Sequence, residues 1–283
     1  MKKVIFFFCL ICIGTFSFAQ DCKVTCPAES LNIVENEKFI NKITGVSFIS
    51  KNIAEAIIQK EINEELHSNV KADLDLFNIK SLKKGEFKGL TLKSKNLKYR
   101  ALSATDVKAL TVCPYNKVLY ENKRLYFPQD MYFKFSGTIT NKDLENVVNS
   151  VEFQNELSRN TLSFRGVNGI KFATPSITID EGYLNFSVPV TSFILKNPYN
   201  VKFRANIEIK NNKIVLRNIT FGSKRNIMNS DLFAPVIDAI NPLTYELNSV
   251  NGKFCNVYLT SAKIVGNEIK AEGVLKINKN YGG

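Results

Sequence analysis

Few residues of this chain have the types and spacing that catalysis requires. His67 is the only histidine. It follows a predicted helix, whose C-terminal end favours a positive charge. Asp73 and Asp75 could form a carboxylate pair for acid–base chemistry, but they alternate with apolar residues and are more simply the solvent face of a strand. The sequence has no nucleophile elbow, phosphate-binding loop or His-Glu-x-x-His motif. We therefore expect a protein that is not an enzyme and that uses no metal or cofactor.

The N-terminal residues 1–19 have the composition of a secretory signal peptide. Lys2 and Lys3 precede an apolar run over residues 4–13, and Ser17-Phe18-Ala19 fits a small-residue cleavage site. The apolar run is too short to span a bilayer as a helix. We expect cleavage after Ala19 and an exported protein, either periplasmic or extracellular.

Cleavage would leave four cysteines, and an even number in an oxidising compartment predicts two disulfides with three possible connectivities. Cys22 and Cys26 are close enough to pair locally, or each could tie an N-terminal arm, residues 20–44, to a strand. The other two cysteines are Cys113 and Cys255. Their scattered spacing and the oxidising compartment argue against a four-thiolate metal site.

The chain is basic, with 38 Lys and Arg against 26 Asp and Glu and a formal net charge of +12. Its lysines are spread over nearly every predicted strand. They could simply keep the surface soluble, or they could attract an anionic membrane or an acidic envelope polymer, at roughly 1 kcal/mol per lysine near a charged bilayer. We do not expect nucleic acid as a partner, because export removes it and no binding motif is present.

An amphipathic helix that runs directly into an amphipathic strand organises the first half. Residues 52–66 have helical apolar spacing, and Asn52 with Glu55 resembles a capping box that would start the helix. Residues 70–76 then alternate with period two, as in a half-buried strand. An earlier strand is expected over residues 40–49.

A second helix is predicted over residues 140–157. Thr140 is a good N-cap, and Asp143 is at the capping-box position. Apolar residues follow at helical spacing, namely Leu144, Val147, Val148 and Val151, with Phe153 and Leu157 in a short continuation. A third, short helix is expected over residues 232–240, before Pro242.

Most of the remaining chain alternates as strands joined by turn signals. Two-residue turns are expected at Asn211-Asn212 and Gly266-Asn267, another turn at residues 180–182, and a β-bulge near Asn96. Hairpin-length connections favour an antiparallel sheet. The sequence therefore predicts one α+β domain over residues 45–283, with a large curved antiparallel β-sheet and amphipathic helices.

The order of these features resembles the LmeA-like family of bacterial phospholipid-binding proteins, which is related in architecture to tubular lipid-binding (TULIP) domains. The resemblance covers roughly residues 45–278. It rests on the first helix and strand, Lys84-Gly85-Glu86-Phe87, Thr140-Asn141-Lys142-Asp143-Leu144 as a helix start, and the hairpin over residues 183–221. It implies a TULIP-like curved sheet wrapped around helices, an apolar groove for acyl chains and no catalytic chemistry. The resemblance implies nothing about the cysteine pairs.

A lipid site of this kind requires a long apolar cavity. Burying one CH₂ is worth roughly 0.8 kcal/mol, so an acyl chain offers about 10 kcal/mol of gross transfer energy. The candidate lining residues, each of which could instead belong to a dry core, are Ile53, Ile57, Leu144, Val148, Phe186, Phe203, Ile207, Phe233 and Ile237.

The expected function is an exported phospholipid-binding protein that holds acyl chains in an apolar groove and could carry lipid in the cell envelope. The alternative is a secreted structural or adhesive module that binds an acidic envelope polymer through its basic surface.

Overall fold

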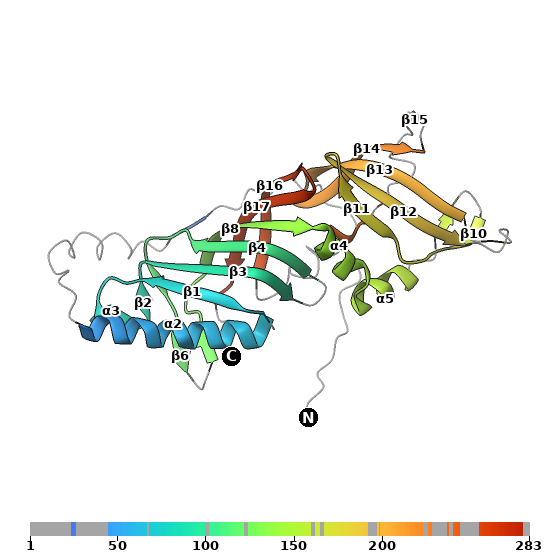
Figure 1. Ribbon diagram of the computed structural model, residues 1–283. Helices are drawn as coiled ribbons and strands as arrows, with labels where there is room; N and C mark the ends of the chain where they lie inside the picture. The colour runs from blue at the N-terminus through green and yellow to red at the C-terminus, as the bar shows by residue number, and fades with distance from the viewer. Residues whose placement is uncertain are drawn as a thin grey trace, which may run out of the picture.

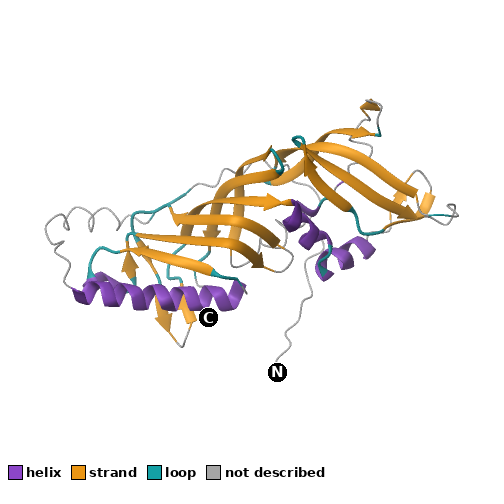
Figure 2. Ribbon diagram, in the orientation of Figure 1, coloured by secondary structure: helices purple, strands orange, loops and turns teal. Residues whose placement is uncertain are grey.

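The computed structural model describes residues 24–26, 45–66, 68–99, 102–121, 124–159, 162–164, 167–191, 197, 199–222, 226–227, 237, 240–243 and 255–279. Two large antiparallel sheets follow one another along an elongated molecule (Figure 1). Strands make up most of the described chain, and the helices lie on one side of the sheets (Figure 2). The predicted signal peptide, Cys22, His67 and Phe233 lie outside the described residues.

The first sheet has six strands in the order β1-β3-β4-β8-β17-β16. Their bounds are β1 Val70–Asp75, β3 Gly89–Tyr99, β4 Leu102–Thr111, β8 Met131–Thr140, β17 Glu268–Ile277 and β16 Cys255–Val265. The long helix α2 (Gly45–Leu66) lies along one edge of this sheet (Figure 1). The first half of the chain also contains several short elements. They are α3 Ile79–Lys83, β2 Glu86–Phe87 paired with β5 Asn116–Lys117, and β6 Leu119–Glu121 paired with β7 Arg124–Tyr126.

The second sheet has the order β15-β14-β13-β12-β10-β9, with β11 also paired to β12. Its strands are β9 Leu162–Phe164, β10 Val167–Phe172, β11 Ser176–Asp180, β12 Tyr183–Thr191, β13 Tyr199–Lys210, β14 Lys213–Phe221 and β15 Asn226–Ile227. The helices α4 (Asn141–Val148) and α5 (Val151–Arg159) lie below it (Figure 1).

The apolar faces of the sheets pack on two cores. In β1 the burial alternates without exception, so Val70, Ala72 and Leu74 point inward, as period-two spacing requires. The first core joins these strands to α2 through Ile58. The second core joins α4 and α5 to the strands of the second sheet and also to β8, β16 and β17 of the first sheet, so it extends across both sheets. The predicted α+β class with a curved antiparallel sheet is confirmed, but the strands form two main sheets where one was expected.

The start of the first helix differs from the prediction. α2 begins at Gly45, so the expected strand is wrong over residues 45–49, and the capping box at Asn52 is also wrong. The first part of that expected strand, residues 40–44, lies outside the described residues. The side chain of Glu55 instead accepts a hydrogen bond from the backbone N–H of Leu74, at 2.8 Å. The Glu55 carboxylate, which the local pattern predicted as part of a helix cap, therefore binds the backbone of a neighbouring strand.

The second helix confirms its predicted start. Thr140 and Asp143 form a reciprocal capping box, and Asp143 is buried. Val151, however, is 71% exposed and does not join the apolar stripe. The chain leaves the helix at Asn149 and Ser150 before α5 begins, which changes the helical phase. The short continuation is confirmed, because Phe153 and Leu157 are buried.

The hairpin turns are found where the sequence predicts them. Asn211 and Asn212 have φ values of 52° and 59°, the left-handed conformation that a tight hairpin requires. The predicted bulge is one strand away from its expected place. Pairing of β3 with β4 continues without a shift through Asn96, and the bulge is in β4 at Asp106, where β4 meets β8.

One disulfide joins Cys26 to Cys113. The local pairing of Cys22 with Cys26 is therefore wrong, and the arm is tied instead to the segment that follows β4. Cys255 begins β16 and is half-buried, and this burial raises the pKa of its thiol. Closing a loop of 87 residues is worth about 4–5 kcal/mol by chain-entropy arguments.

The third helix is described only in part. Ile237 and Ile240 are helical and buried in the second core. Asn241 is not helical, so this helix ends before Pro242 as predicted, and a new helical segment begins at Pro242.

Candidate functional site

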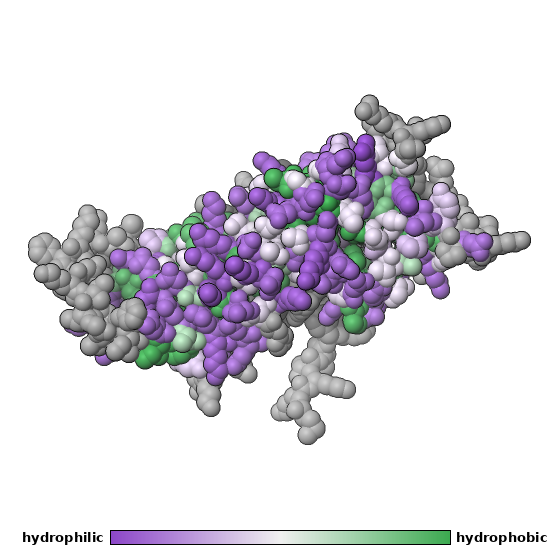
Figure 3. Space-filling view, in the orientation of Figure 1, coloured by the Kyte–Doolittle hydropathy of each residue, from purple (hydrophilic) through white to green (hydrophobic). Residues whose placement is uncertain are grey.

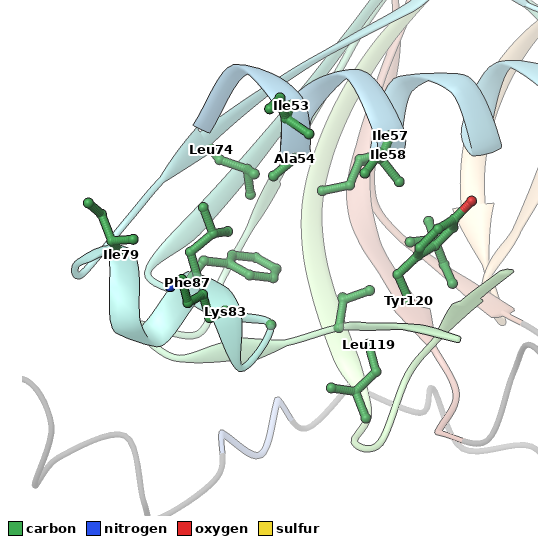
Figure 4. Close-up of a pocket in the computed structure, with 14 residues that line it drawn as sticks. Ile53, Ala54, Ile57, Ile58, Leu74, Ile79, Lys83, Phe87, Leu119 and Tyr120 are labelled. Carbon is green, nitrogen blue, oxygen red and sulfur yellow. The ribbon is translucent and has the colours of Figure 1, made fainter. Parts of the chain in front are cut away.

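An apolar hollow of about 440 Å³ lies between α2 and the inner face of the first sheet (Figure 4). α2 forms one wall, α3 closes one end, and the β6–β7 hairpin lies opposite the helix. The lining residues, almost all of them apolar, are Ile53, Ala54, Ile57, Ile58, Leu74, Ile79, Leu82, Lys83, Gly85, Phe87, Val118, Leu119, Tyr120 and Leu125.

Hydrogen bonds to the free edge of β1 hold α2 over this hollow. Glu55, Gln59 and Asn63 are spaced by four residues and therefore share one side of the helix. They bond the backbone of Leu74, Ala72 and Val70 at 2.8, 3.3 and 2.6 Å, respectively. β1 is an edge strand, and an uncovered edge is open to pairing with another chain. The polar side of α2 thus covers the edge while its apolar side faces the hollow.

An ion pair also fixes the position of α2 along the strand. The Lys51 ammonium lies 2.9 Å from the Asp73 carboxylate and 3.4 Å from that of Glu55. The bond to Asp73 raises the pKa of Lys51, and the same bond lowers the pKa of Asp73. Asp73 and Asp75 are both exposed, which confirms the solvent face predicted for this strand.

The hollow has a buried floor and an exposed mouth. Ile58, Leu74 and Phe87 are each less than 10% exposed and form the floor. Ile53 is 56% exposed and Tyr120 is 47% exposed, so large apolar surface remains uncovered at the mouth. In the space-filling view, apolar side chains reach the surface over the N-terminal half of α2, within a largely hydrophilic face (Figure 3).

Gly85 allows the chain to turn closely at one end of the hollow. It has φ +74°, and a Cβ at this position would lie 1.9 Å from the carbonyl oxygen of Val118. The backbone N–H of Val118 donates to the carbonyl of Gly85 at 2.9 Å. No other residue type fits this contact without moving the backbone, so the glycine sets the position of the β5–β6 segment.

Lys83 is the one charged side chain among the described residues that line the hollow. It is exposed and ends α3, so a positive charge lies beside an apolar space. Among the described residues, no group of three or more His, Cys, Asp or Glu is arranged to bind a metal ion. The arrangement suits an amphipathic ligand with an apolar part inside and a polar or anionic part outside.

The structure divides the nine predicted groove residues. Ile53 and Ile57 line the hollow. Ile207 is half-buried against the second core, Phe233 lies outside the described residues, and the other five are buried in the second core, namely Leu144, Val148, Phe186, Phe203 and Ile237. The rings of Phe186 and Phe203 stack at 4.6 Å between centroids. A ligand-binding role for the residues of the second core stays a prediction.

Sequence reasoning missed the residues that short elements bring to the hollow. α3 contributes Ile79 and Leu82, and the segment from β2 to β7 contributes Phe87, Leu119 and Leu125. These elements are too short to show a hydrophobic period. The spacing of Glu55, Gln59 and Asn63 is visible in the sequence, but no local signal shows that these side chains bind the edge of a strand.

Comparisons with models of known protein families, with curated proteins and with solved structures found no match to this chain. Among the described residues, no helix is both long enough and apolar enough to cross a membrane.

Proposed function

We propose that this protein is exported and binds the acyl chain of a lipid in the hollow beneath α2. The single observation that carries the proposal is a hollow of about 440 Å³ with thirteen uncharged lining residues and one lysine. This volume is within the range typical of small-molecule sites, which are concave and mostly apolar. The LmeA-like resemblance supports the same class of ligand.

The energetics favour an alkyl chain as the occupant. Each CH₂ that leaves water gains about 0.8 kcal/mol, so six to eight methylenes would offset a typical cost of immobilising a small ligand. The exposed side chains of Ile53 and Tyr120 would cover further parts of the ligand at the mouth. Lys83 would face the headgroup, since a phosphate or carboxylate attracts an ammonium group.

Native mass spectrometry of the purified mature protein, followed by solvent extraction and lipid analysis, tests the proposal. We expect a co-purified lipid at a fixed ratio. A protein that stays free of ligand after incubation with liposomes would contradict it.

A pair of matched variants localises the site. Ala54 lines the hollow, whereas Ala56 is exposed on the same helix. Ala54→Phe should fill part of the hollow and reduce lipid uptake at least tenfold, and Ala56→Phe should leave uptake unchanged. Equal uptake by both variants would show that lipid binds elsewhere. Circular dichroism would verify that both variants remain folded.

A further inference from the structure

Strand pairing brings three lysines that are far apart in the sequence into one row. Lys71 of β1 lies directly opposite Lys93 of β3, and Lys93 lies directly opposite Lys108 of β4. All three side chains are exposed. Their neighbours Ala72 and Ala109 are buried, so the lysines point to the outer face of the curled sheet. Because adjacent strands are about 4.8 Å apart, the row carries one positive charge on each of three neighbouring strands.

This lysine row is unfavourable for the stability of the sheet. Like charges directly opposite each other across two strands are destabilising. Among the described residues, none of the three lysines forms an ion pair; the nearby Asp73 is paired with Lys51 at 2.9 Å. Lys93 lowers the pKa of Asp73 only through a weaker, longer-range attraction. Packing and pairing therefore give no reason for the lysine row.

The surroundings of the row carry further charges of both signs. Lys95 is the next outward residue of β3 after Lys93, and Lys134 of β8 is diagonal to Lys108. Exposed carboxylates lie two residues from the row at Asp73 of β1 and at Asp106 of β4, and the lateral row continues through β8 to Glu272 of β17.

We propose that the lysine row binds a linear polyanion that lies across β1, β3 and β4. A flexible polymer can follow an outward-curving face and place successive anionic groups on successive strands. A flat bilayer would touch only a small part of such a face. The hollow lies on the inner side of the same sheet, so this surface is separate from the proposed lipid site and does not depend on it.

The test compares two triple variants that remove the same charge. The row variant is Lys71→Gln, Lys93→Gln and Lys108→Gln. The control variant changes three exposed lysines that are dispersed over α4, β10 and β13, namely Lys142→Gln, Lys171→Gln and Lys202→Gln. The probe is dextran sulfate, a linear anionic polysaccharide, with affinity measured by isothermal titration between about 50 and 200 mM NaCl, the range over which counterion release is strong.

The row variant should bind dextran sulfate at least tenfold more weakly than the wild type, and the control variant less than threefold more weakly. The slope of log affinity against log salt should fall by about 2 to 3 in the row variant, roughly 0.7–0.9 for each lost contact. Its melting temperature should equal or exceed that of the wild type, because the repulsion is relieved. Lipid uptake should be unchanged.

Two results would overturn the proposal. An equal loss of affinity in both variants would mean that binding follows net charge alone. A row variant that keeps its affinity for dextran sulfate but loses binding to vesicles containing phosphatidylglycerol would assign the row to a membrane surface.

Discussion

The side-chain amide of Asn212 accepts a hydrogen bond from the backbone N–H of Leu259 at 2.6 Å. Its Nδ2 donates to the carbonyl of Val257, also at 2.6 Å. Asn212 belongs to the turn between β13 and β14, whereas Leu259 and Val257 belong to β16. The Asn212 side chain thus bonds the backbone of the edge strand β16, as a neighbouring strand would. This contact joins the second sheet to the first.

Asn212→Ala should lower the free energy of unfolding by about 2–4 kcal/mol. It removes the partners of two backbone groups, at about 1–3 kcal/mol in total, and it places alanine at positive φ, at about 1 kcal/mol. Asn211→Ala is the matched control, because Asn211 also has positive φ but does not bond β16. Urea denaturation of both variants isolates the contribution of the bridge. Equal destabilisation would show that only backbone strain matters.

The polar side of α2 should contribute to stability through the edge of β1. Asn63→Ala leaves the N–H of the buried residue Val70 without its acceptor, so we expect a loss of about 1–3 kcal/mol. Glu64→Ala, one residue further along, removes only an exposed ion pair at 3.9 Å and should change stability by less than about 0.5 kcal/mol. Chemical denaturation measures both. If Asn63→Ala matched Glu64→Ala, α2 would not depend on the strand edge.

Asp143 should be the most sensitive polar residue of the second helix. Its carboxylate accepts hydrogen bonds from Ser103 at 2.7 Å, Thr105 at 3.0 Å and the backbone of Thr140 at 2.9 Å. Asp143→Ala removes one half of the capping box and leaves the hydroxyl groups of Ser103 and Thr105 without this acceptor, so it should cost about 3 kcal/mol. Asp180→Ala, at an exposed position of β11, is the control. A loss below about 1 kcal/mol for Asp143→Ala would contradict this interpretation.

The ion pair between Asp130 and Lys276 should make stability depend on pH. Burial alone would raise the pKa of Asp130, but hydrogen bonds from Lys276 and from the backbone N–H of Lys279 outweigh it and lower that pKa. The same bond raises the pKa of Lys276. The contribution of Asp130 is therefore complete above its unfolded pKa of about 3.9 and is lost as the pH falls through the folded value.

Asp130→Asn should destabilise the protein by up to about 1 kcal/mol between pH 5 and 9. The difference from the wild type should shrink below about pH 4, as the carboxyl of the wild type becomes protonated. Asp75→Asn removes a carboxylate from an exposed position and is the control for the loss of one negative charge. Thermal melts over this range of pH check both variants, and a difference that grows at low pH would reverse the predicted sign.

Features that depend only on neighbours within a few residues could be predicted from the sequence. The capping box of Thr140 and Asp143 requires only a four-residue spacing, and the turn at Asn211 and Asn212 requires only residues that tolerate positive φ. Strand alternation in β1 and β13 is equally local, because side chains point to opposite faces in turn. The α+β class and the antiparallel pairing followed from these signals.

Which apolar residues form a core and which line a hollow depends on the packing of distant segments and could not be predicted from the sequence. Leu144 and Ile57 have the same helical spacing in the sequence, yet Leu144 is fully buried while Ile57 lines an open space. Burial depends on what a second element places opposite, and α3 and the short strands of the hollow have no periodic signal. Sheet register likewise aligned Lys71, Lys93 and Lys108, which no local spacing relates. Contacts between segments that are distant in the chain depend on how the whole chain folds. They therefore could not be predicted from the residues of any single segment.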